Sequence, residues 1–187
     1  YAGTKRSEEC TIIFTEGDSA KTMAISGLSA IPNGNNFYGV FPLKGKLLNV
    51  REATNKQIIN NEEFKNIQQI LGLKINKHYT KDNLSELRYG SIILMMDADV
   101  DGSHIKGLFI NMLNYFWPSL MKIDGFVKIF ITPIVKAASG KITHSFYTLS
   151  DYNNWKNSIK SDKWEIKYYK GLGTNTPTEA KEYFKNL

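Results

Sequence analysis

Residues 91–102, Ser-Ile-Ile-Leu-Met-Met-Asp-Ala-Asp-Val-Asp-Gly, join the most apolar run of the chain to three closely spaced aspartates. This short apolar run, bounded by polar residues, predicts a buried strand over residues 91–96. Apolar side chains then recur every three or four residues from Ile105 to Phe116, which predicts an amphipathic helix that ends before Pro118. A strand that leads through acidic residues into a helix is typical of a parallel α/β sheet, where chemistry lies beyond the carboxyl ends of the strands.

The N-terminal region contains a second junction of this kind. Residues 11–15, Thr-Ile-Ile-Phe-Thr, predict a buried strand. The acidic residue Glu16 follows at once, and a helical pattern begins after it with Asp18 or Ser19 as the expected N-cap. Two strands therefore end directly at carboxylates, and in a parallel sheet both ends meet at one edge.

Between these junctions, residues 37–41 predict another strand that ends at Pro42. Residues 55–71 predict a single helix, because Phe64, Ile67 and Leu71 are spaced by three and four. The alternation of strands and helices over the first 120 residues or so favours a parallel sheet with right-handed crossovers.

The pattern changes in the C-terminal third. Residues 126–135 and 145–149 predict strands on either side of a turn at Gly140. A short helix is expected near residues 152–159, then a strand over 164–169 and a last helix. We therefore expect two parts within one compact unit: an α/β core over residues 1–124 and a smaller β/α extension over residues 125–187.

Length and composition limit the class of protein. The 187 residues, 42% of them hydrophobic, suffice for one domain with a real core. A single cysteine excludes a disulfide framework and a cysteine-based zinc cluster, as expected of an intracellular protein. No apolar run reaches the roughly 20 residues of a membrane span, and the first residues are too polar for a signal peptide. The formal net charge of +6 is compatible with a phosphate-rich partner.

The predicted edge gathers Glu16 with Asp97, Asp99 and Asp101. Carboxylates brought this close together repel one another unless a cation or hydrogen-bond donors compensate them. Hard oxygen ligands with open coordination positions suit Mg²⁺, which retains waters and takes a substrate phosphate. A plainer role stays open for Asp101, which could simply cap the following helix.

Other interpretations of the aspartates are possible. An EF-hand loop is excluded, since position twelve would be Leu108 instead of a bidentate glutamate. Asp97-Ala-Asp99 also resembles the nucleophile strand of haloacid-dehalogenase-like phosphatases, which would make Asp97 a covalent phosphoryl acceptor. That motif normally lies on the first strand and leaves Glu16 unexplained, so the phosphohydrolase remains an alternative.

Four motifs, taken in order, resemble a single family, the TOPRIM region of type IIA DNA topoisomerases. They are residues 16–20 (Glu-Gly-Asp-Ser-Ala), 42–53 (Pro-Leu-Lys-Gly-Lys-Leu-Leu-Asn-Val-Arg-Glu-Ala), 97–107 (Asp-Ala-Asp-Val-Asp-Gly-Ser-His-Ile-Lys-Gly) and 169–174 (Tyr-Lys-Gly-Leu-Gly-Thr). Residues 49–53 and 130–134 are more similar to the eukaryotic or large DNA virus enzymes than to bacterial gyrase B, whereas Ala98 and Val100 are closer to the bacterial pattern.

The resemblance implies a Rossmann-like TOPRIM fold with helices on both faces of a mainly parallel sheet. It also implies an ATP-dependent, homodimeric enzyme that passes one DNA duplex through a transient double-strand break in another. The implied cofactor of this region is Mg²⁺, with Mn²⁺ or Ca²⁺ as substitutes, while ATP binds elsewhere in the full-length protein. The eukaryotic resemblance implies a nuclear location and no membrane.

The same resemblance assigns roles to individual residues. Glu16, Asp97 and Asp99 are expected to be catalytic and to hold the metal, with Asp101 as a further acidic ligand and Glu16 as a candidate for proton transfer. The expected DNA-contacting residues are basic: Lys44, Lys46, Arg51, His104 and Lys170. Five glycines are expected to serve the backbone conformation or close approach: Gly17, Gly45, Gly102, Gly171 and Gly173.

Strand cleavage in this family needs a tyrosine nucleophile. Arg88-Tyr89 resembles the Arg-Tyr pair around the family's nucleophile. It immediately precedes the predicted strand at residue 91, however, and at that place the family has a non-catalytic Arg-Tyr pair. The nucleophile is expected in a winged-helix region after this stretch, and the ATP-binding region before it. We therefore expect this chain alone to neither cleave nor relax DNA.

Overall fold

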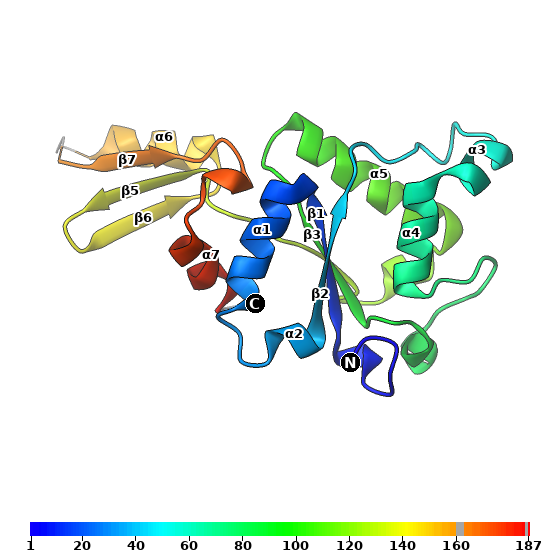
Figure 1. Cartoon of the computed structure of the whole chain (residues 1–187). Helices are drawn as coiled ribbons and strands as arrows, with labels where there is room; N and C mark the ends of the chain where they lie inside the picture. Colours follow the sequence, from blue (N-terminus) through cyan, green and yellow to red (C-terminus); the bar gives the residue numbers. More distant parts are fainter. Residues whose placement is uncertain (160–162, 186) are drawn as a thin grey trace.

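A computed structural model describes residues 1–159, 163–185 and 187, and in it the chain forms two sheets (Figure 1). The larger sheet has four parallel strands in the order β2-β1-β3-β4. These strands are β1 (Thr11–Glu16), β2 (Tyr38–Leu43), β3 (Ser91–Met95) and β4 (Val127–Ile129). The mainly parallel α/β architecture predicted from the sequence is confirmed.

The two central strands, β1 and β3, form the most buried part of the sheet. Ile13 of β1 pairs with Ile93 of β3 on one side and with Val40 of β2 on the other. Because successive side chains alternate between the two faces of a sheet, Ile13 and Phe14 reach separate hydrophobic clusters. Both side chains are fully buried. Apolar residues at consecutive positions thus form a strand that is covered on both faces.

Helices cover the larger sheet on both sides (Figure 1). α1 (Gly17–Leu28) and α7 (Pro177–Phe184) lie on one face and share a cluster that includes Phe184. α4 (Glu62–Leu71) and α5 (Val100–Phe116) lie on the other, where Phe109 contacts Phe14 with ring centroids 4.9 Å apart. The short α3 (Asn55–Asn60) precedes α4.

A smaller antiparallel sheet follows in the order β6-β5-β7. Its strands are β5 (Val135–Ser139), β6 (Ile142–Phe146) and β7 (Glu165–Tyr168). α6 (Leu149–Ser158) packs on one face around a small cluster that contains Phe146 and Tyr152. In Figure 1 this sheet lies beside α1 and α7, at the far side from α4.

The remaining elements are short. They are α2 (Gly34–Phe37) and the 3₁₀ helices η1 (Ser7–Glu9), η2 (Lys81–Glu86), η3 (Leu120–Lys122) and η4 (Leu172–Thr174). Within the described residues, none of the helices combines the length and the hydrophobicity needed to cross a bilayer.

Two helix predictions are corrected by capping. The N-cap of α1 is Glu16, not Asp18 or Ser19: its backbone is extended and the helix already begins at Gly17, although the Glu16 side chain makes no capping bond. Gly17 has a left-handed φ of 69°, which glycine accepts, where the chain turns from β1 into α1. The single helix expected over residues 55–71 is two helices, since Asn61 has an extended backbone and its side chain accepts a hydrogen bond from the Phe64 N–H at 2.8 Å.

The strand predictions are corrected at their ends. β2 continues through Pro42, which an edge strand tolerates because one of its sides needs no hydrogen-bond donor. The segment 126–135 divides between the two sheets, with Pro133 in the connection, where it cannot donate to a ladder. The strand expected over 145–149 ends at Phe146 because Thr148 caps α6.

Candidate metal centre

The carboxyl ends of β1 and β3 bring two acidic segments together. These strands are neighbours in register, with Thr15 opposite Met95. The Glu16 carboxylate consequently reaches across and accepts a hydrogen bond from the Asp97 backbone N–H at 3.1 Å. The helices α1 and α5 both begin at this edge, so the partial positive charge of their N-termini favours anionic groups there.

Asp97 is held by a third, distant segment. Its Oδ1 accepts a hydrogen bond from the Leu172 backbone N–H at 2.7 Å. A Cβ atom on Gly171 would lie 2.6 Å from Asp97 Oδ2, and one on Gly102 would collide with the Asp97 carbonyl oxygen. Both glycines therefore permit a close approach around Asp97, and a side chain at either position would displace its neighbours.

The other two aspartates have different partners. Asp99 is the N-cap of α5, and its Oδ1 accepts a hydrogen bond from the Gly102 N–H at 2.7 Å. The capping role considered for Asp101 thus belongs to Asp99. Asp101 lies in the first turn of the helix and pairs instead with Lys46, Nζ to Oδ1 2.9 Å.

The acidic residues interact electrostatically. Burial raises the pKa of Glu16, and the nearby charges of Asp97, Asp99 and Asp101 raise it further, against the hydrogen bond from the Asp97 N–H. The hydrogen bond and the positive charge of Lys46 lower the pKa of Asp101. Of these carboxylates, Glu16 is therefore the one whose ionised form a nearby cation would stabilise most.

The donor set matches the chemistry of Mg²⁺. Among the described residues, no three Asp, Glu, His or Cys side chains converge into a preformed metal-binding group. Mg²⁺ does not require one, because it commonly takes one or two protein carboxylates and completes its shell with waters and substrate phosphate. Glu16 and Asp97 provide such a pair, and Asp99 has one oxygen that its capping bond does not use.

The predicted basic residues Lys44, Lys46 and Arg51 follow β2 and have different partners. Lys46 contacts the acidic cluster directly through Asp101, whereas the backbone N–H of Lys44 donates to Glu63 at 3.1 Å. Arg51 donates through Nε to Asn111 at 2.6 Å. Asn111 lies ten residues after Asp101 on α5, or about 15 Å along the helix. The fold therefore brings Lys46, but not Arg51, to the carboxylates.

The remaining predicted site residues lie near the cluster or stabilise its loops. His104 is exposed, and its charge helps to lower the pKa of Asp101. Lys170 is exposed and precedes Gly171. Gly45 has a left-handed φ of 82°, as glycine favours, while a Cβ on Gly173 would make only an ordinary contact.

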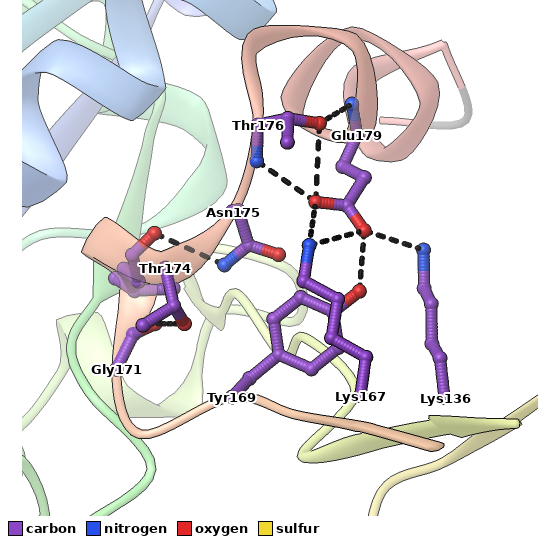
Figure 2. Close-up of polar contacts among 9 residues, drawn as sticks. Lys136, Lys167, Tyr169, Gly171, Thr174, Asn175, Thr176 and Glu179 are labelled. Atoms are coloured by element: carbon purple, nitrogen blue, oxygen red, sulfur yellow. Dashed lines mark hydrogen bonds and ion pairs between the residues drawn. The ribbon is translucent and has the colours of Figure 1, made fainter. Parts of the chain in front are cut away.

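Sequence reasoning missed the network that fixes the loop after β7 (Figure 2). The Glu179 carboxylate accepts hydrogen bonds from the Tyr169 hydroxyl, from Lys167 Nζ at 2.9 Å and from the Thr176 N–H at 2.8 Å. The capping-box pattern of Thr176 and Glu179 was visible in the sequence, but the contacts with β7 depend on the tertiary fold.

Together, the fold and this edge define a Rossmann-like α/β domain that presents acidic residues beyond the carboxyl ends of its central strands. Residues 11–131 match the family model of the Toprim domain, and residues 130–187 match that of the C-terminal associated domain of TOPRIM. The chain belongs to the Toprim family, and the resemblance inferred from the four motifs is confirmed.

The relatives are DNA topoisomerases. The chain is 55% identical to DNA topoisomerase 2 of Plasmodium falciparum and 56% identical to DNA topoisomerase 2-beta of Homo sapiens, with 100% of this chain aligned in each case. It spans only 13% and 11% of their lengths. These similarities favour the Toprim interpretation over the phosphohydrolase alternative.

A solved structure is similar over the same extent. The crystal structure of the Plasmodium falciparum topoisomerase II DNA-binding, cleavage and re-ligation domain superposes with a TM-score of 0.92 at 55% identity. The match covers 99% of this chain and 25% of that one. The fold described above is thus the fold of one part of a larger topoisomerase domain.

Proposed function

We propose that this chain is the Mg²⁺-binding cleavage and religation module of an ATP-dependent type II DNA topoisomerase. The observation that carries the proposal is the hydrogen bond from the Asp97 N–H to the Glu16 carboxylate at the carboxyl edge of the sheet. Asp99 and Asp101 are close enough to this pair to raise the pKa of Glu16. The similarity of the whole chain to one part of DNA topoisomerase 2 supports it.

Three residues of this chain would hold the ion: Glu16, Asp97 and Asp99. A bound Mg²⁺ would supply stabilisation of the negative charge that develops on the leaving oxygen of a phosphodiester. Asp97 is kept in place by the Leu172 N–H, and Asp99 by its capping bond to α5. Glu16, whose pKa is raised by burial and by the neighbouring aspartates, is proposed as the group that transfers a proton during religation.

The basic residues would contact the DNA backbone. Lys46 stands beside the acidic cluster, where it can exchange its exposed partner Asp101 for a phosphate oxygen. Lys44, His104 and Lys170 are exposed around the same edge and would add phosphate contacts. Arg51, which is bonded to Asn111 farther along α5, would meet a more distant part of the duplex.

The chain by itself is proposed not to cleave DNA. Tyr89 lies just before β3, whereas Asp97 follows the other end of that strand, so the tyrosine is at the opposite edge of the sheet. Burial raises its pKa, which opposes its use as a nucleophilic phenolate. A nucleophile from another part of the enzyme would therefore complete the site.

The wider assignment rests on the relatives. Homodimer formation, ATP hydrolysis elsewhere in the protein and a nuclear location are proposed for the whole enzyme. A relative that is 54% identical to this chain is named "DNA topoisomerase 2, mitochondrial", from Dictyostelium discoideum. Substitution of Mg²⁺ by Mn²⁺ or Ca²⁺ follows from the same oxygen ligands.

Asp97→Asn tests the proposal. In the complete enzyme we expect it to reduce DNA cleavage at least about 100-fold, since even outer-shell partners of metal ligands cost about 10- to 100-fold. In this chain, calorimetry should detect weakened Mn²⁺ binding. Asp124→Asn is the matched control, because Asp124 is an exposed aspartate beside β4, remote from the acidic edge.

The same variants separate the alternatives. Undiminished cleavage in Asp97→Asn would contradict the proposal and leave the acids as helix caps. Turnover of p-nitrophenyl phosphate by this chain, lost in Asp97→Asn, would instead favour the aspartate-nucleophile phosphohydrolase. We expect no such turnover.

A further inference from the structure

One carboxylate fixes both ends of the loop between β7 and α7 (Figure 2). On the upstream side, the Tyr169 hydroxyl donates a hydrogen bond to Glu179 Oε1. On the downstream side, the Thr176 N–H and hydroxyl donate to Glu179 Oε2 at 2.8 and 3.1 Å. Residues 170–175 therefore form a loop whose two ends are tied to the same group.

The carboxylate is suited to this role. The Glu179 side chain is only 17% exposed and forms ion pairs with Lys167 at 2.9 Å and Lys136 at 3.7 Å. Burial alone would raise its pKa, but the hydrogen bonds from Thr176, Tyr169 and Lys167 outweigh burial and lower it to about 2. Glu179 is thus ionised at neutral pH and retains all of its partners.

The loop itself is internally bonded. The Thr174 hydroxyl donates to the Gly171 carbonyl at 2.6 Å, and Asn175 Nδ2 donates to the Leu172 carbonyl at 3.0 Å. Each bond closes a tight turn within the loop. Leu172 is 2% exposed and its side chain packs in the cluster of Ile13 and Phe184. These internal bonds leave the loop few ways to bend between its two ends and this buried tip.

The tip of this loop is what holds Asp97. The Leu172 N–H donates to Asp97 Oδ1 at 2.7 Å, and Gly171 lies against Oδ2. We propose that Glu179 is a positioning residue for the acidic centre: it orients the Asp97 carboxylate through the loop 170–175. This inference rests on the proposed function, in which Asp97 is a metal ligand.

The test compares Glu179→Gln and Tyr169→Phe with Glu182→Gln. Glu182 is an exposed glutamate on the same helix and has no hydrogen bond or ion pair to the described residues. Tyr169→Phe removes a single hydrogen bond and leaves the capping of α7 intact, so it decides the matter if Glu179→Gln does not fold. The measurements are Mn²⁺ affinity by calorimetry, hydrogen exchange of the Leu172 amide without metal, and the melting temperature.

We expect both test variants to bind Mn²⁺ about tenfold more weakly, as outer-shell partners typically do. The Leu172 amide should exchange about tenfold faster in them, while Glu182→Gln behaves like the unsubstituted chain. A purely structural role would lower the melting temperature but leave the Mn²⁺ affinity of the folded protein unchanged, and that result overturns the inference.

Asp97→Asn distinguishes this failure from failure of the proposed function. If it weakens Mn²⁺ binding while Glu179→Gln and Tyr169→Phe do not, only the positioning role is lost. If Asp97→Asn also leaves Mn²⁺ binding unchanged, the metal site and the inference built on it are both wrong.

Discussion

The two sheets of this protein are stabilised in different ways. In the larger sheet, Ile13 and Phe14 of β1 are fully buried between helices on both faces. In the smaller sheet, every residue of β7 and all but one of β6 are exposed. Among the residues that the structure describes, its buried cluster comprises Val135, Ala137, Phe146 and Tyr152, supplemented by aromatic contacts such as Trp155 against Trp164.

The difference matches what each sheet contributes to the candidate site. The larger sheet positions Glu16, the last residue of β1, and Asp97, two residues beyond the end of the adjacent β3, where close packing of the strands leaves little freedom. The smaller sheet contributes one backbone N–H, that of Leu172, through a loop stabilised by polar contacts around Glu179. The Leu172 side chain is buried in the cluster that covers one face of the larger sheet. Ligand placement thus depends on a hydrophobic core in one region, and in the other on hydrogen bonds together with one side chain anchored in that core.

Phe14→Ala should have the largest effect. The ring is completely buried and contacts Phe109, and removing it leaves a cavity between β1 and α5. We expect a loss of about 3 to 5 kcal/mol in the free energy of unfolding, measured by urea denaturation. A loss as small as that of a surface substitution would contradict the tight packing assigned to this sheet.

Phe146→Ala should cost less, about 2 kcal/mol, and its effect should be local. The ring lies at the edge of a small cluster, against Trp155 and Tyr152. Hydrogen exchange should accelerate in β5 and β6 while β1 and β3 keep their protection. Equal acceleration in both sheets would show that the two regions unfold as one unit.

Gly171→Ala should disturb the contact between the regions. The added Cβ would lie 2.6 Å from Asp97 Oδ2, so the loop and the carboxylate must separate. We expect about 1 to 2 kcal/mol of destabilisation and weaker Mn²⁺ binding. Gly173→Ala is the matched control, since its Cβ would be 3.5 Å from the nearest atom of Ser19.

The smallest expected effect is a change in how steeply stability falls with acid, and it comes from the Glu179 network. The pKa of Glu179 is lowered from 4.5 to about 2 in the folded chain, so its stabilisation is fully present above pH 4.5 and is lost as the pH falls toward 2. Urea midpoints between pH 6 and 3 should therefore decline less steeply in Glu179→Gln than in the unsubstituted chain. Glu182→Gln should retain the original slope.

The sequence predicted the elements whose local signals agree with their tertiary setting. The strand before Asp97 and the helix after it followed from one apolar run and one clear periodicity. The contact of Glu16 with Asp97 followed from the rule that parallel strands end at a common edge. Family membership followed from four motifs in order.

The errors arose where a distant partner decides the outcome. Pro42 stays in β2 only because that strand has a neighbour on one side, which local sequence does not reveal. The cap of α5 is a local exception: Asp99, not Asp101, takes that role because the helix already begins at Val100, before the apolar periodicity that starts at Ile105. The contacts of Glu179 with Tyr169 and Lys167 require β7 and α7 to meet, and no spacing in the sequence encodes that meeting.

The separation of the contacting residues along the chain also has a kinetic consequence. Glu16 and Asp97 are 81 residues apart, and Asp97 and Leu172 are 75 apart. Contacts between such remote positions form slowly, because the entropy cost of closing a long loop comes before the stabilising contact is made. During translation, the aspartate cannot acquire this hydrogen-bond donor until Leu172 has emerged from the ribosome, so the acidic edge stays incomplete until the loop after β7 has been made.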